Sequence, residues 1–246
     1  GQVDGSVIPG MSGLEAGQSA FGDLLAWFRD LLLWPMEKVV SHSPALTEKQ
    51  RADLLADAAA RLIPELSAAA EQIPISESLP VALDWINGRR SPDADQQLKS
   101  AIANLTLGSS APHLFKALVH AICYGSKKIV DRFEAEGVSI HSVIGVGGVA
   151  RKSGFIMQTL ANVLNRPIAV AASDQAPALG AAIYAAVAAG IHPDIPAAAR
   201  IMGSPVEVTF QPEPEAAAVL EEEFRVYEKL GAFAATLARD AQMQKT

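Results

Sequence analysis

The chain has 246 residues, of which half are hydrophobic and 19% are charged, and its formal net charge is −7. This composition predicts a globular protein with one large or two small domains and a sizeable core. A negative chain without a lysine and arginine cluster argues against nucleic-acid binding, because phosphate contacts need cationic side chains. The single cysteine, Cys123, excludes an intrachain disulfide framework, fits a reducing compartment and is predicted to be a small core residue.

No targeting or membrane segment is visible. The N-terminal GQVDGSVIPGMSG lacks a basic stretch followed by an apolar one, so we expect no signal peptide there. The stretch 175–193 has no Asp, Glu, Lys or Arg, but it is mostly alanine and contains Pro177 and Gly180. Because alanine inserts weakly into a bilayer, we expect a buried core helix there and a cytoplasmic protein.

Residues 15–72 are predicted to form a helical portion. EAGQSAFGDLLAWFRDLLL repeats its apolar residues at helical spacing, beginning with Phe21, Leu24 and Leu25. Thr47 followed by Gln50 three residues later is a capping box, which predicts the start of a second helix. Pro64 is expected to end or kink that helix.

Residues 79–246 alternate predicted strands with predicted helices. LPVALDWI, 140–146 and 168–172 are predicted strands, whereas 154–164, 175–189 and 214–241 are predicted helices. Asp174 is the expected N-cap of the helix over 175–189. Such alternation predicts βαβ units and a mostly parallel sheet in an α/β fold.

Adjacent glycines, Gly147 and Gly148, end the strand over 140–146 and precede a helix. In open α/β sheets, ligands bind beyond the carboxyl ends of the strands, and glycines let a base or phosphate approach the backbone. Alternatively, the pair serves only as a tight turn, because neither G-x-G-x-x-G nor a Walker motif is present. Gly108 in LTLGSSAPHLF also precedes a helix, and the two turns together predict a nucleotide cleft.

Three motifs carry a resemblance that covers nearly the whole chain. GVGGVARKSGFIMQTLANVLNRPIAV resembles a signature of the FGGY carbohydrate kinases, in the sugar kinase–actin–chaperone ATPase superfamily. DWINGRRSPDAD and IPGMSGLEAGQSAFGDLLAWF narrow the resemblance to the members that phosphorylate ribulose. The resemblance implies a ribonuclease-H-like (actin-like ATPase) domain with an added helical insertion. It implies the C-terminal, nucleotide-binding half of such an enzyme, with the N-terminal sugar-binding domain absent.

The resemblance also implies roles for individual residues. Gly147 and Gly148 would pass close to the adenine or ribose, with Ser153 near the adenine and Gly108 in the other nucleotide-contacting turn. Glu15 would reach the ribulose; from its chemistry alone it is more simply a first-turn helix carboxylate. No catalytic residue is expected in this chain, because the family's aspartate base lies in the other half. The five histidines are predicted to be structural or solvated, and no metal ligands are expected.

The implied reaction is L-ribulose + ATP to L-ribulose 5-phosphate + ADP, in pentose and arabinose catabolism. ATP and Mg²⁺ are the implied cofactors, because phosphoryl transfer needs positioning and charge neutralisation. The expected partners are ribulose or a related pentulose, ATP, the N-terminal domain of the same enzyme and a possible second copy in a homodimer. Two alternatives stay open: an actin-like or chaperone-like ATPase module, and a nucleotide-binding module without catalysis.

Overall fold

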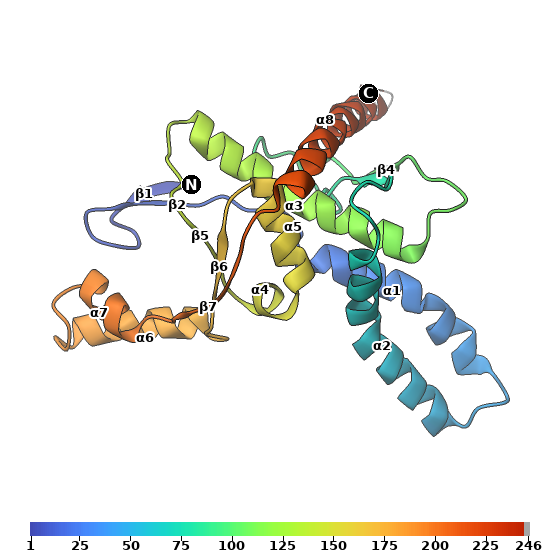
Figure 1. Ribbon diagram of the computed structural model, residues 1–246. Helices are drawn as coiled ribbons and strands as arrows, with labels where there is room; N and C mark the ends of the chain where they lie inside the picture. Colours follow the sequence, from blue (N-terminus) through green and yellow to red (C-terminus); the bar gives the residue numbers. More distant parts are fainter. Residues whose placement is uncertain (244–246) are drawn as a thin grey trace. The chain divides into compact units, whose positions relative to one another are not determined.

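The computed structural model describes residues 1–243, and Figure 1 labels the helices and strands. The chain divides into two compact units. Unit 1 comprises residues 1–17 and 129–217, and unit 2 comprises residues 18–128 and the described chain from 218 onward. Helices α3 (Ala111–Ala135) and α8 (Pro214–Met243) each contribute residues to both units. The predicted division into a helical portion, 15–72, and a βαβ portion, 79–246, stays a prediction.

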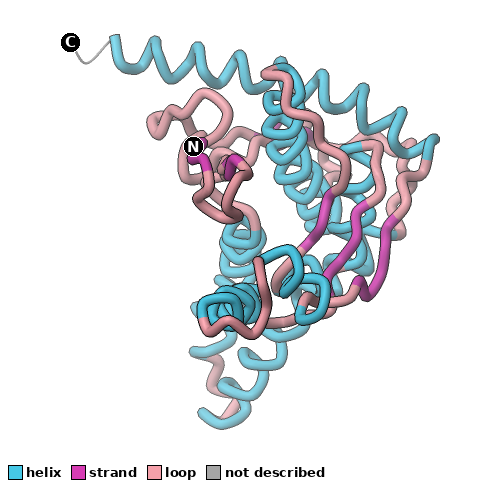
Figure 2. Tube along the Cα trace, turned by 90° about the vertical axis from the view of Figure 1, so that its left-hand side faces the viewer, coloured by secondary structure: helices cyan, strands magenta, loops and turns pink. Residues whose placement is uncertain are grey.

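Unit 1 is built around a three-stranded sheet. Its strands lie in the order β5 (Val143–Gly145), β6 (Ile168–Ala171), β7 (Val206–Phe210), and Figure 2 shows them side by side. The pair β5–β6 is parallel and the pair β6–β7 is antiparallel. A separate antiparallel hairpin joins β1 (Gln2–Asp4) to β2 (Ser12–Leu14).

Four helices follow the strands of this sheet in unit 1. They are α4 (Gly148–Lys152), α5 (Gly154–Leu164), α6 (Ala176–Ala188) and α7 (Ile195–Met202). Helix α5 packs on the sheet, where Ala161, Leu164 and Ile168 form a buried cluster with Val130, Val143, Leu160 and Phe210. Val143 and Ile168 are the first residues of β5 and β6, so this cluster anchors the two parallel strands at their amino ends, opposite the ends that lead into α4 and the turn after β6.

Unit 2 is mostly helical. It contains α1 (Gly22–Lys38), the short 3₁₀ helix η1 (Val40–His42) and α2 (Glu48–Glu71). Two short strands, β3 (Val81–Ala82) and β4 (Ile102–Ala103), pair in antiparallel fashion. The middle of α3 is buried from Phe115 to Gly125, and this stretch includes the fully buried Cys123. Burial raises the pKa of the Cys123 thiol, as expected for a core residue.

Several predicted elements are confirmed. Helix α5 has the predicted bounds, 154–164, because Ser153 caps its start and Asn165 ends it in the left-handed conformation (φ 46°). The capping box of Thr47 and Gln50 is present at the start of α2. Strand β6 and helix α8 begin at the predicted residues, Ile168 and Pro214.

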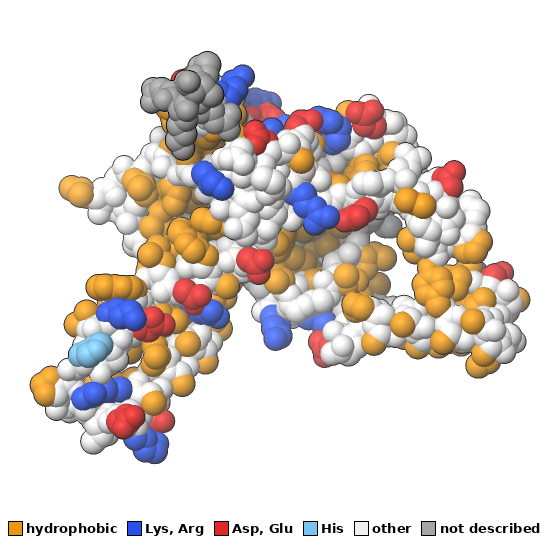
Figure 3. All heavy atoms as spheres, turned by 180° about the vertical axis from the view of Figure 1, so that it is seen from behind, with side chains coloured by type: hydrophobic (Ala, Val, Ile, Leu, Met, Phe, Trp, Pro, Cys, Tyr) orange, Lys and Arg blue, Asp and Glu red, His pale blue; other side chains and the backbone are white. Residues whose placement is uncertain are grey.

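Other expectations are wrong. The sheet is not mostly parallel, since β5–β6 is the one parallel pair among the named strands of residues 1–243. Of the two outcomes expected at Pro64, an end of the helix is wrong, because α2 continues through it to Glu71, whereas a kink there stays a prediction. The uncharged helix α6 is not a core helix: it buries only Ile183 and Ala186. Figure 3 shows mostly hydrophobic and uncharged side chains over the hairpin of α6 and α7, whereas that of α1 and α2 carries several charges of both signs.

Candidate functional site

The double-glycine turn lies in unit 1, directly after β5. Gly147 has a φ of +88°, a conformation that side chains other than glycine rarely adopt, and it caps the short helix α4. A Cβ added to Gly147 or Gly148 would meet no atom within 4 Å. By contrast, a Cβ on Gly145 would lie 3.2 Å from the Ala150 side chain. Gly145 therefore serves packing, whereas the space beside Gly147 and Gly148 is open to a ligand.

Ser153 lies at the other end of α4, so the structure brings it together with the double glycine. Its Oγ accepts a hydrogen bond from the Ile156 backbone N–H at 3.3 Å and caps α5. A serine hydroxyl that accepts one bond still has a proton to donate.

Arg151 of α4 links this turn to two other segments of unit 1. Its Nε lies 3.0 Å from Glu207 Oε2 on β7, and its Nη1 donates to Asp174 Oδ1 in the turn after β6. Asp174 is thus an ion-pair partner and not the N-cap of α6; the cap residue is Gln175, whose N–H donates to Ser173 Oγ. Hydrogen bonding to Glu207 raises the pKa of Arg151 above its ordinary value.

Gly108 lies in unit 2, in the turn before α3. Its N–H donates to Thr106 Oγ1 at 3.2 Å, and the Thr106 N–H donates in turn to Ser109 Oγ at 3.0 Å. The neighbouring Leu107 is fully exposed. The turn is therefore exposed, and its own side chains hold it in shape.

Glu15 follows β2 in unit 1 and is exposed. Its backbone N–H donates to the Gly1 carbonyl at 2.7 Å, which extends the hairpin by one residue. Helix α1 begins only at Gly22, so the interpretation of Glu15 as a first-turn helix carboxylate is wrong.

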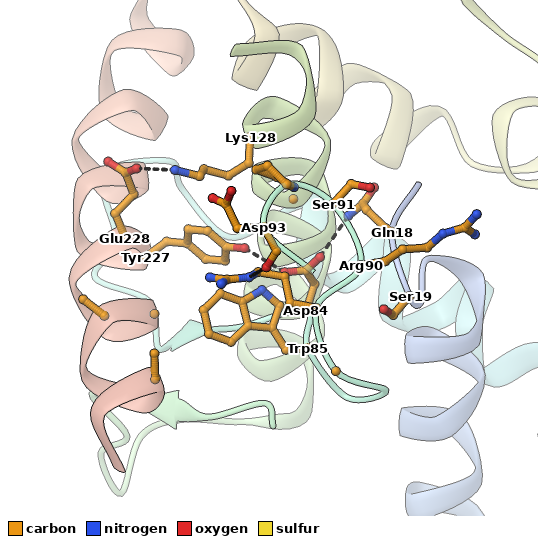
Figure 4. Close-up of a pocket in the computed structure, with 17 residues that line it drawn as sticks. Gln18, Ser19, Asp84, Trp85, Arg90, Ser91, Asp93, Lys128, Tyr227 and Glu228 are labelled. Atoms are coloured by element: carbon orange, nitrogen blue, oxygen red, sulfur yellow. Dashed lines mark hydrogen bonds and ion pairs between the residues drawn. The ribbon is translucent and has the colours of Figure 1, made fainter. Parts of the chain in front are cut away.

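A pocket of about 220 Å³ in unit 2 was not predicted (Figure 4). Its lining includes Asp84, which is only 6% exposed and accepts hydrogen bonds from Gln18 Nε2 at 3.0 Å and the Tyr227 hydroxyl at 2.7 Å. Figure 4 shows the carboxylate between these two donors, with Lys128 directed toward Glu228, 2.8 Å away. Burial raises the pKa of Asp84, although both hydrogen bonds oppose that shift.

The walls of this pocket are closely packed. The Arg89 guanidinium lies 5.0 Å from the centre of the Trp85 ring, and a Cβ on Gly231 would lie 2.9 Å from the same ring. A Cβ on Gly125 would overlap Gln18 and Asp84. Trp85 is thus a buried wall covered by other groups, not a free platform for a sugar.

A second buried polar cluster joins α3 to α8 in unit 2. His120 Nδ1 and the Tyr124 hydroxyl lie 2.9 and 3.0 Å from the same oxygen, Glu223 Oε2. Burial favours a raised pKa for Glu223, but these two hydrogen bonds hold it below the ordinary value. Burial lowers the pKa of Lys116, whose Nζ donates to the Ile73 carbonyl at 2.6 Å.

Residues 1–243 contain neither a clustered metal-ligand set nor a membrane-spanning helix. Within that range, no group of three or more His, Cys, Asp or Glu side chains is placed to hold a metal ion. No helix in the same range is both long and apolar enough to cross a membrane.

Comparison with known families identifies the domain. The family model described as "FGGY family of carbohydrate kinases, C-terminal domain" matches residues 1–189. The chain belongs to this family. The resemblance carried by its three motifs is thereby confirmed.

Curated relatives of this FGGY domain are ribulokinases. The ribulokinase of Vibrio parahaemolyticus is 46% identical over 247 residues, which cover 100% of this chain and 42% of that protein. The ribulokinase of Halalkalibacterium halodurans is 38% identical over 231 residues, or 92% of this chain and 38% of that protein. The chain therefore spans about two fifths of the length of these relatives.

Solved structures agree with the predicted fold class. The xylulose kinase of Rhodospirillum rubrum matches 94% of this chain and 41% of its own chain, with a TM-score of 0.73 and 22% identity. A gluconate kinase of Lactobacillus acidophilus matches 89% of this chain and 39% of its own chain, with a TM-score of 0.67 and 20% identity. The expected α/β fold of the sugar-kinase and actin-like ATPase class is confirmed.

Proposed function

We propose that this FGGY domain is the nucleotide-binding part of an ATP-dependent kinase that converts L-ribulose and ATP to L-ribulose 5-phosphate and ADP. The ribulokinase relatives support the choice of sugar, and family membership supports phosphoryl transfer. The observation that carries the nucleotide assignment is the open space beside Gly147 and Gly148 at the carboxyl end of β5. Ligands of open α/β sheets bind at such ends.

In this proposal, the adenine and ribose lie against the backbone of Gly147 and Gly148. The Ser153 hydroxyl donates a hydrogen bond to the nucleotide while its oxygen keeps its capping bond to α5. Gly108 contributes the second nucleotide-contacting turn through its exposed backbone. Glu15 accepts hydrogen bonds from the hydroxyl groups of ribulose, for which a carboxylate is well suited.

The proposed chemistry is divided between this domain and an N-terminal, sugar-binding domain. An aspartate of that domain takes the proton from the ribulose hydroxyl, whose oxygen then bonds to the γ-phosphorus. The bond from the γ-phosphorus to the bridging oxygen breaks, and ADP leaves with that oxygen. Holding alcohol and phosphate in line supplies most of the acceleration in such a transfer.

Magnesium enters this proposal with the nucleotide. Mg²⁺ usually keeps several waters and is bound through substrate phosphates and one or two carboxylates. The absence of a three-ligand cluster within residues 1–243 is compatible with that mode of binding. When bound, the ion neutralises phosphate charge; the residues of this chain act on the base, ribose and sugar.

Titration calorimetry with ADP and with ATP plus magnesium tests the nucleotide site. Gly148→Val is the informative variant, because its Cβ meets nothing within 4 Å in the free protein and Gly148 is outside the left-handed region. We expect the variant to fold and to lose affinity, since a branched side chain occupies the proposed base position. Gly180→Val on α6 is the matched control, because its added Cβ is equally unobstructed. Equal affinity in folded Gly148→Val and wild type would contradict the site.

A turnover assay tests the division of the chemistry. We expect the 246-residue chain with ATP, magnesium and L-ribulose to form no more than traces of product beside full-length Vibrio parahaemolyticus ribulokinase. Loss of general-base help alone costs about 10²–10⁴-fold. Comparable turnover would place a catalytic base within this chain. ATP hydrolysis that ribulose leaves unchanged would instead favour the alternative of an ATPase module.

A further inference from the structure

Arg151 joins three separate segments of unit 1 through one guanidinium group. It lies on α4, directly after the double glycine, and its Nε and Nη2 lie 3.0 and 3.5 Å from the two carboxylate oxygens of Glu207 on β7. Its Nη1 donates to Asp174, in the turn that follows β6. A planar guanidinium can serve two carboxylates in fixed directions, which the single nitrogen of a lysine cannot do.

Helix α4 is short, and few of its side chains are buried. The helix has five residues, only Ala150 is buried, and Gly147 provides no side-chain cap. The double glycine itself contributes no side chain to packing. Besides the contacts of α4 with α5 and β6, the side chains that fix the orientation of this turn are therefore the buried Ala150, the half-buried Val149 and the ion-paired Arg151.

We propose that Arg151 is a positioning residue for nucleotide binding, acting with Glu207 and Asp174 to hold the Gly147–Gly148 backbone against the ends of β5 and β6. This inference rests on the proposed function. Arg151 does not contact the nucleotide in this account; it sets the position of the backbone that does.

The three side chains of this ion-pair network are too exposed to contribute much to the stability of the fold, which leaves positioning of the turn as their role. The side chains of Arg151, Asp174 and Glu207 are 24%, 71% and 47% exposed. Ion pairs this exposed contribute little to the free energy of unfolding. Their loss should therefore change the geometry of the turn, and with it nucleotide affinity, more than it changes the melting temperature.

Calorimetric ADP affinity and thermal unfolding of the 246-residue chain test the inference together. We expect Arg151→Gln to weaken ADP binding about tenfold, or about 1.4 kcal/mol, and Arg151→Lys to weaken it less. Glu207→Gln should also weaken binding, because the neutral amide loses the charge-assisted bond. Arg200→Gln on α7 is the control, since it removes the same charge from an exposed helix of the same unit and should leave affinity unchanged.

The possible results separate this inference from the function on which it rests. Wild-type affinity in both Arg151→Gln and Glu207→Gln would overturn the positioning role while leaving the nucleotide site intact. If Arg151→Gln fails to fold, Glu207→Gln alone decides. No ADP binding by wild type would overturn the proposed function and this inference with it. If Arg200→Gln weakened ADP binding to the same extent as Arg151→Gln, the change in net charge would explain both losses. That result would contradict the positioning role of Arg151.

Discussion

Gln18 donates a hydrogen bond from Nε2 to Asp84 Oδ2 at 3.0 Å, across 66 residues of sequence. The same amide nitrogen donates to the Ile122 carbonyl at 2.8 Å, and the amide oxygen accepts from Ser126 Oγ at 2.7 Å. The motif EAGQS is therefore tied to the motif DWINGRR through one buried carboxylate. Gln18 of the first motif and Asp84 of the second thus belong to one polar network in unit 2.

Removing the hydroxyl of Tyr227 should destabilise unit 2. Tyr227→Phe leaves Asp84 Oδ1 without its donor, and an unsatisfied buried acceptor costs about 1–3 kcal/mol. Urea unfolding followed by tryptophan fluorescence measures this, because all three tryptophans lie in unit 2. Thr236→Val removes an exposed hydroxyl from the same helix and should change stability by about 0.5 kcal/mol or less. Equal effects of the two substitutions would contradict the importance of the Asp84 bond.

Asp84 should make folding less favourable as pH rises. Its pKa in the folded chain is above the ordinary 3.8, so the folded state binds this proton more tightly than the unfolded state does. The resulting stabilisation is present below the unfolded pKa and is lost as pH rises through the folded value. Asp84→Asn removes this titration. Unfolding free energies from pH 3.5 upward should show wild type losing stability relative to Asp84→Asn, and a constant difference would contradict the raised pKa.

A methyl group at Gly125 should disrupt the same network. The Cβ of Gly125→Ala would overlap Gln18 and Asp84, so we expect a loss of about 1–3 kcal/mol despite the better helix propensity of alanine. Gly108→Ala is the matched control in unit 2, because its Cβ would lie 3.6 Å from Thr106 Oγ1, an ordinary contact. Chemical denaturation of both variants measures the difference. Wild-type stability in Gly125→Ala would show that the network rearranges without cost.

Replacing Glu15 should impair the use of ribulose but not the binding of ATP. The enzyme to be tested is one that joins this chain to its proposed sugar-binding domain. A hydrogen bond to a charged group contributes about 1.5–3 kcal/mol, so Glu15→Ala should lower kcat/KM for ribulose about tenfold to hundredfold. The KM for ATP should stay close to wild type. Glu71→Ala, at the end of α2, removes an equally exposed carboxylate as a control. A rise in the KM for ATP would assign Glu15 to the nucleotide instead.

Local signals explain which elements were predictable from the sequence. Helix α5 was predicted within its observed bounds because its cap, Ser153, and its end, Asn165, are adjacent to it in sequence. Strand pairing depends on distant partners, and the sheet was mispredicted because Val206–Phe210 returns antiparallel to β6 after α7. Pairings of this kind leave no periodic trace in a single sequence.

In the candidate sites, too, local features were predictable from the sequence and features built from distant residues were not. The double glycine was recognisable because both residues are adjacent and follow an apolar strand. The Asp84 network was missed because it assembles Gln18, Asp84 and Tyr227 from three distant segments. Its one local signal was an aspartate inside the apolar run LPVALDWI, since a charge in a buried run needs partners.

The burial of Cys123 makes the chain ready for site-specific labelling. Its thiol has no exposed surface and a raised pKa, so it carries little of the thiolate that reacts with maleimides. Since the sequence contains no other cysteine, Leu107→Cys would supply the one accessible thiol, next to Gly108. A fluorophore attached there would test, without background from the native cysteine, whether a nucleotide reaches that turn as proposed.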